Sequence, residues 1–79
     1  MGDGMEEEIV QIDNDFITLG QLLKYIDLIP SGGMAKWYLS EYYVYVNDEE
    51  EMRRGRKLYD GDFIEFPHEE RLIRIQKIS

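Results

Sequence analysis

The chain has 79 residues, enough for one small domain, and it lacks cysteine, so neither a disulfide nor a thiolate metal site can stabilise it. Its formal net charge of −8 is unevenly spread: residues 1–15 hold six acidic residues and no basic one, whereas residues 31–57 hold five of each. No apolar run approaches the ~20 residues of a membrane span, so we expect a cytoplasmic protein with no membrane contact.

The N-terminal residues 1–8 combine two glycines with four acids and offer little to bury. We expect a flexible acidic segment there, followed by a single domain over residues 9–79. Residues 9–12 are predicted as a short strand, because alternation would place Val10 and Ile12 on one face.

A first helix is predicted to begin after Thr18, which can form a capping box with Gln21. The buried face would consist of apolar residues at helical spacing, namely Leu19, Leu22, Leu23 and Ile26. Lys24 falls outside this face, and Pro30 rules out continuation of the helix.

A second short helix is predicted over residues 33–41, after the break at residues 31–33. Its apolar side would consist of Ala35, Tyr38, Leu39 and Tyr42, with Lys36 on a different face. Ser31 can cap this helix. Alternatively, the backbone N–H groups of residues 31–33 contact an anion, with Lys36 one turn further on.

Strand signals dominate the remainder, at residues 43–46, 58–59, 63–66 and 72–78, with turns at residues 47–48, 60–62 and 67–70. The order of elements predicts an α+β domain in which two short helices pack on a small antiparallel sheet.

The sharpest local charge signal lies at residues 53–57, where four of five residues are cations: Arg53, Arg54, Arg56 and Lys57. Such a cluster, with a glycine that permits close backbone approach, makes a good phosphate-binding edge. The alternative is a solvated loop whose charge is neutralised by the acids of residues 48–51, with residues 49–51 forming a solvated face of a hairpin.

Catalysis and metal binding find little support. His68, the lone histidine, is predicted in a solvated turn without a nucleophile nearby, and residues 13–15 lack the glycine and terminal glutamate of a calcium loop. We expect no enzymatic activity, no cofactor and no metal. Trp37, beside Lys36, is a candidate for a surface stacking role.

The order of these signals resembles the S4 RNA-binding domain. The resemblance runs over residues 17–66 and is carried by ITLGQLLK, SGGMAK, VYVND and GDFI, while SGGMAKWYLSE and RRGRKLYDGD look like the small stand-alone YaaA-type S4-domain proteins of bacteria. It implies the S4-type (alpha-L) fold and a basic surface for structured RNA, either ribosomal or transfer RNA. Many members begin the first helix with arginine and carry a Ser-Arg pair at the second, whereas Ile17-Thr18 and Ser31-Gly32 stand here.

The resulting expectation is a non-catalytic, monomeric RNA-binding module, with the ribosome or a protein as a further partner. Its candidate RNA-binding residues are Ser31, Lys36, Arg53, Arg54, Arg56 and Lys57. The acidic segment would either compete with RNA for this surface or only aid solubility. The rival interpretation is a protein-interaction adaptor that keeps the S4 fold with weak or no RNA affinity.

Overall fold

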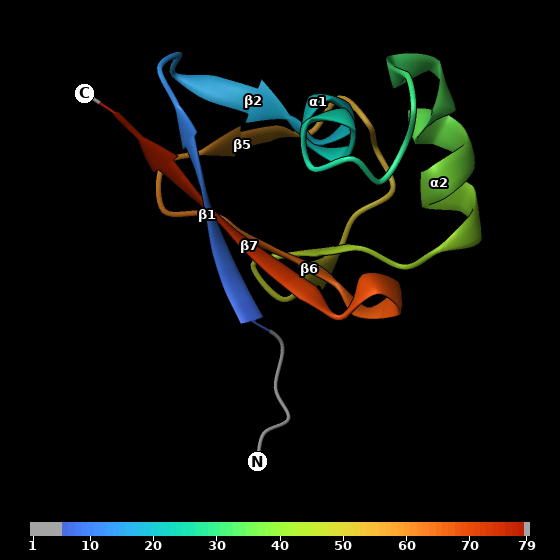
Figure 1. Cartoon of the computed structure of the whole chain (residues 1–79). Coiled ribbons are helices and arrows are strands. Elements are labelled where there is room, and N and C mark those ends of the chain that lie inside the picture. The colour runs from blue at the N-terminus through green and yellow to red at the C-terminus, as the bar shows by residue number, and fades with distance from the viewer. Residues whose placement is uncertain (1–5, 79) are drawn as a thin grey trace.

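Two sheets and two α-helices make up the computed structural model, which describes residues 6–78. In chain order the elements are β1 (Glu6–Ile12), β2 (Phe16–Thr18), α1 (Leu19–Tyr25), the 3₁₀ turn η1 (Gly32–Met34), α2 (Ala35–Glu41), β3 (Tyr45–Val46), β4 (Glu49–Glu50), β5 (Lys57–Tyr59), β6 (Phe63–Phe66), the 3₁₀ turn η2 (Pro67–Glu69) and β7 (Arg71–Lys77). Both helices and the β2–β5 pair lie on one side of the main sheet (Figure 1).

The main sheet is mixed, which corrects the prediction of a small antiparallel sheet. Its five strands follow the order β1-β7-β6-β3-β4, and β1 runs parallel to β7 while the other pairs are antiparallel. A parallel pair needs a long crossover connection, and here the rest of the domain supplies it. A second sheet pairs β2 with β5. The predicted α+β class is confirmed, with a larger sheet than expected.

The strand β1 begins at Glu6, so the predicted boundary between a flexible segment and the domain is wrong for residues 6–8. Glu7 accepts a hydrogen bond from Nε of Arg74 at 2.9 Å, and Glu8 pairs with Arg71 at 2.7 Å. These two acids are therefore already paired with cations on the neighbouring strand. Residues 1–5 of the predicted segment lie outside the described part of the chain.

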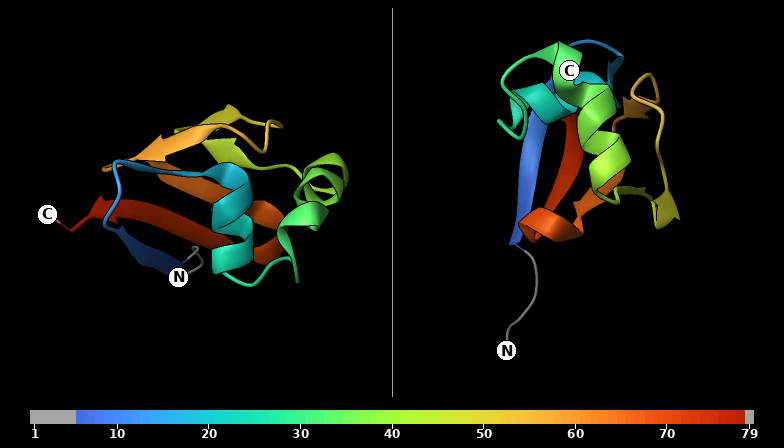
Figure 2. Two further views of the ribbon diagram at one scale, coloured as in Figure 1. Left: turned by 90° about the horizontal axis from the view of Figure 1, so that it is seen from above. Right: turned by 90° about the vertical axis from the view of Figure 1, so that its right-hand side faces the viewer.

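The core joins the helices to the main sheet. The predicted apolar face of α1 is buried throughout, and Val10 and Ile12 are buried on one face of β1, as their alternation predicts. The inward residues of β6 and β7 complete the cluster: Ile64, Phe66, Ile73 and Ile75. Figure 2 shows α1 and α2 packed beside each other over this core.

Helix ends and turns follow local chemistry. The helix α1 ends well before Pro30, because Asp27 adopts a left-handed φ of 66° and Leu28 donates its N–H back to the carbonyl of Leu23 at 2.9 Å. The predicted turn joins β3 to β4, with Asn47 and Asp48 both at positive φ, as a two-residue hairpin requires.

Candidate functional site

The start of α1 is fixed by its own side chains and by a distant loop. Thr18 and Gln21 form the predicted capping box: Thr18 Oγ1 accepts from the backbone N–H of Gln21 at 3.2 Å, and the N–H of Thr18 donates to Gln21 Oε1 at 2.9 Å. The next free N–H groups, those of Leu19 and Gly20, donate to the carbonyls of Arg56 and Arg54, both at 2.8 Å. Residues 53–56 are thereby tied to the helix start.

A glycine allows close approach at this junction. A Cβ atom on Gly20 would lie 3.3 Å from the carbonyl oxygen of Arg54 and 3.4 Å from the Cβ of Ala35. The first distance is shorter than ordinary van der Waals contact, so a side chain at position 20 would make a neighbouring atom shift by a few tenths of an ångström. Because position 20 has no side chain, α1, the start of α2 and the loop of residues 53–56 meet at one place.

A groove opens at this meeting point, and we call it the helical groove. Its lining residues are Thr18, Gly20, Gln21, Lys24, Gly32, Ala35, Arg54 and Gly55. Two of them, Lys24 and Arg54, are cations, and none is acidic. Three are glycines, which let an incoming chain approach the backbone closely. Gln21 adds an amide group whose oxygen is already held by Thr18, so its NH₂ remains the outward donor.

Glu51 forms ion pairs with two of the four cations of the predicted basic cluster. This carboxylate is only 7% exposed, which corrects the prediction that residues 49–51 form a solvated face. It accepts five hydrogen bonds of 2.8–3.1 Å, from the N–H groups of Met52 and Arg53 and from the guanidinium groups of Arg53 and Arg56. Hydrogen bonds from Arg53 above all lower the pKa of Glu51 from 4.5 to about 2. Arg53 and Arg56 therefore hold a loop together and share one buried negative charge.

The other predicted binding residues are spread around the groove. Arg54, next to the paired Arg53, is the only one of the six candidates among the lining residues. Lys57 lies on β5 with Nζ 4.8 Å from the ring centroid of Phe16. Lys36 is exposed in the first turn of α2, and Ser31 is exposed without a side-chain capping bond. The predicted second helix begins as the 3₁₀ turn η1, and α2 proper follows at Ala35.

Sequence reasoning missed Lys24 and Gln21 as groove residues. Both were assigned a place on α1, Gln21 as part of the cap and Lys24 outside the apolar face. Their i, i+3 spacing puts them one above the other on the exposed face, and that spacing is the signal that could have identified them.

The aromatic residues form a separate cluster. His68 stacks on Tyr42 with ring centroids 4.0 Å apart, and the exposed Trp37 meets Tyr42 edge-on at 6.1 Å. Within residues 6–78, no group of three or more acidic or histidine side chains is arranged to hold a metal ion. No helix in that part of the chain is long and apolar enough to cross a membrane.

Two comparisons relate the chain to known proteins. The family model described as the S4 domain matches residues 10–76. A protein of Bacillus subtilis (strain 168) named "Probable ribosome maturation protein RlbA" is 64% identical over 56 residues, which cover 71% of this chain and 79% of that protein. The resemblance carried by residues 17–66 is confirmed, and the chain belongs to the S4 domain family.

Proposed function

We propose that this protein is a non-catalytic module that docks on structured RNA through the helical groove. The observation that carries the proposal is the charge of the groove: Lys24 and Arg54 face it, and no acidic side chain lines it, in a chain whose net charge is −8. An acid-free cationic hollow in an otherwise acidic protein is suited to bind a phosphate backbone.

The chemistry of the groove favours recognition of RNA shape. Arg54 can hold two phosphate oxygens with its planar guanidinium, and Lys24 supplies a point charge. Gly32 and Gly55 offer backbone at close range, and the N–H groups that start α1 are already bonded within the protein. Contacts of this kind position a folded RNA without reading its bases.

The similarity to a ribosome maturation protein points to ribosomal RNA as the first RNA to test, with transfer RNA as the comparison. In this proposal the protein acts as a monomer in the cytoplasm, and Lys36 and Lys57, which lie outside the lining of the groove, extend the contact.

The proposal is tested by the salt dependence of RNA binding. With about three to four phosphate contacts, the slope of log K against log salt is expected near −3. The double variant Lys24→Gln/Arg54→Gln should flatten the slope by about 2 units and weaken binding to every structured RNA alike. The matched control, Arg74→Gln/Lys77→Gln, removes two cations that are already paired on β7, and it should leave the slope nearly unchanged.

A protein-interaction adaptor is the second candidate, and two observations favour it. Glu51 neutralises part of the basic loop, and an aromatic pair of the exposed Trp37 and the partly buried Tyr42 offers a surface typical of protein contacts. If the variant at Lys24 and Arg54 binds structured RNA as tightly as the parent protein, the adaptor function is the better account.

A further inference from the structure

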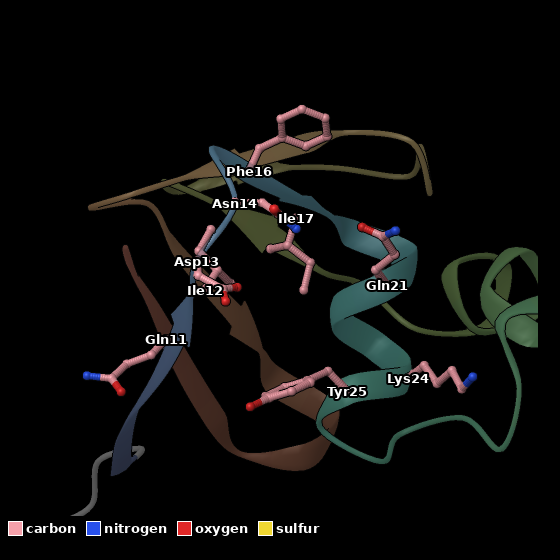
Figure 3. Close-up of a pocket in the computed structure, with 9 residues that line it drawn as sticks. All are labelled: Gln11, Ile12, Asp13, Asn14, Phe16, Ile17, Gln21, Lys24 and Tyr25. Atoms are coloured by element: carbon pink, nitrogen blue, oxygen red, sulfur yellow. The ribbon is translucent and has the colours of Figure 1, made fainter. Parts of the chain in front are cut away.

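A second hollow of about 490 Å³ lies on the other side of α1 from the helical groove, and its size is within the range of small-ligand sites. We call it the tyrosine pocket. It is bounded by the end of β1, the turn into β2, β2 itself and α1 (Figure 3). Its lining residues are Gln11, Ile12, Asp13, Asn14, Phe16, Ile17, Gln21, Lys24 and Tyr25.

Tyr25 gives this pocket an unoccupied aromatic face. Its side chain is 63% exposed and reaches from α1 towards β1 along one side of the hollow (Figure 3). Within residues 6–78 the ring takes part in no aromatic pair and no cation–π contact, whereas Phe16 across the pocket packs against Tyr59 and Lys57. A flat partner can therefore stack on the exposed part of Tyr25 without displacing an aromatic ring or a cation of the described chain.

The polar groups of the pocket favour a neutral ligand with hydrogen-bonding edges. Asp13 lies at the hollow and would repel a phosphate placed inside it. Asn14, in the turn from β1 to β2, supplies an amide group with a donor and an acceptor, whereas the Gln11 side chain extends away from the hollow and its Nε2 donates to Gln76 at 3.1 Å (Figure 3). A nucleobase combines the flat face, the lack of charge and the donor and acceptor edges that this lining selects.

The tyrosine pocket and the helical groove share two lining residues. Gln21 and Lys24 line both hollows, one on each side of α1. Lys24 and Tyr25 are neighbours in sequence, and Figure 3 shows their side chains leaving the helix in opposite directions. The two side chains would therefore contact different parts of one RNA, Lys24 a backbone phosphate and Tyr25 a base.

We propose that the tyrosine pocket binds one unpaired base of the RNA that docks in the helical groove, with the base stacked on Tyr25. This inference rests on the proposed RNA-binding function and adds to it the kind of RNA recognised. The preferred target is a duplex interrupted by a bulged or looped nucleotide, because a fully paired stem offers no base to the pocket.

The test compares two hairpin RNAs of equal stem length, one fully paired and one with a single bulged nucleotide, prepared with each of the four bases. The parent protein should bind the bulged set about 5- to 10-fold more tightly, the low end of the range for stacking on one aromatic side chain. Tyr25→Ala should lose that preference, bind the paired hairpin as before and keep the same salt slope. Tyr25→Phe should retain the preference.

Two controls make the result specific. Tyr43→Ala removes a tyrosine of similar exposure, 67%, that lies outside both hollows. It should change the affinity for neither the paired nor the bulged hairpin. A 2-aminopurine bulge reports stacking directly, and its fluorescence should fall on binding to the parent protein and to Tyr25→Phe but not to Tyr25→Ala. Circular dichroism verifies that each variant is folded.

The outcomes separate this inference from the function on which it rests. Equal binding of paired and bulged hairpins, with no effect of Tyr25→Ala, would overturn the base pocket and leave docking in the groove intact. Failure to bind either hairpin at low salt would remove both. Adenosine monophosphate is titrated in parallel, and tighter binding of that mononucleotide than of the bulged hairpin would contradict an RNA base as the ligand.

Discussion

The two ends of the domain use their cations in different ways. On the β1–β7 edge, Arg71, Arg74 and Lys77 are paired with Glu8, Glu7 and Asp15 at 2.7–2.9 Å. At the helical groove, Lys24 and Arg54 form no ion pair with any residue of the described chain. The candidate binding surface therefore differs from the β1–β7 edge in whether its cations are ion-paired, and not in how many basic residues it has.

The same contrast holds within the basic loop. Arg53 and Arg54 are adjacent and both exposed, yet Arg53 pairs with Glu51 and Arg54 lines the groove. The four cations of residues 53–57 look alike in the sequence. In the fold, the buried carboxylate of Glu51 forms ion pairs with Arg53 and Arg56 but not with Arg54.

The largest stability effect is expected from Glu51→Ala. The change removes the carboxylate that accepts five hydrogen bonds and leaves the partly buried guanidinium of Arg56 without its partner. We expect the free energy of unfolding to fall by about 2 kcal/mol, which corresponds to a melting temperature lower by roughly 8–16 °C for a domain of this size. Thermal unfolding followed by circular dichroism measures it.

The matched control for that change is Glu49→Ala, at an exposed position two residues earlier, which should shift stability by less than about 0.5 kcal/mol. Equal effects at the two positions would contradict a special role for Glu51. Where Glu51→Ala remains folded, it also frees Arg53 and Arg56, so the salt slope for RNA should steepen.

Gly20→Val should have an effect of comparable size. Branched atoms at this position would press on the backbone of Arg54 and on Ala35, and overpacking of this kind costs about 1–3 kcal/mol. The loop of residues 53–56 should also move away from α1, which weakens RNA binding. Gly55→Val is the comparison, since nothing lies within 4 Å of a Cβ there, and urea unfolding should show little change for it.

Acid should weaken the domain through the same carboxylate. Because the pKa of Glu51 is about 2 in the folded protein and 4.5 is its ordinary value, its stabilisation is present above about pH 4.5 and is lost as the pH falls towards 2. Glu8 contributes in the same direction, because a hydrogen bond from Arg71 lowers its pKa. Urea unfolding between pH 2.5 and 6 should show a shallower pH dependence for Glu51→Gln than for the parent; equal dependence would exclude Glu51 as the main source.

The smallest stability effect is expected on the β1–β7 edge. Glu7→Gln breaks an ion pair whose two side chains are both about 40% exposed, and such pairs contribute roughly 0–1 kcal/mol. Urea unfolding at low and high salt should show a slight loss that disappears when salt screens the charges. A loss of several kcal/mol would mean that the edge depends on this pair far more than its exposure suggests.

Local patterns in the sequence predicted the local features of the fold. The capping box at Thr18, the buried face of α1, the alternation in β1 and the turn at Asn47 each depend on residues a few positions apart, and each is confirmed. The parallel pairing of β1 with β7 and the short β2–β5 sheet depend on contacts across most of the chain, which no local periodicity encodes.

The candidate site was predicted only in part for the same reason. The residues of loop 53–57 stood out by charge, but Glu51 resembled its solvated neighbours because its burial arises from the fold. Lys24 looked like an ordinary exposed lysine until the loop was placed beside it, since residues 24 and 54 are joined only by tertiary packing.

Two neighbouring arginines allow a direct test of whether unpaired cations bind RNA and paired ones do not. Arg54→Gln and Arg53→Gln each remove one exposed arginine from the same loop. The salt slope for structured RNA should flatten by about 1 unit in Arg54→Gln and remain close to the parent value in Arg53→Gln. Equal flattening in the two variants, or a larger effect at Arg53, would contradict the account.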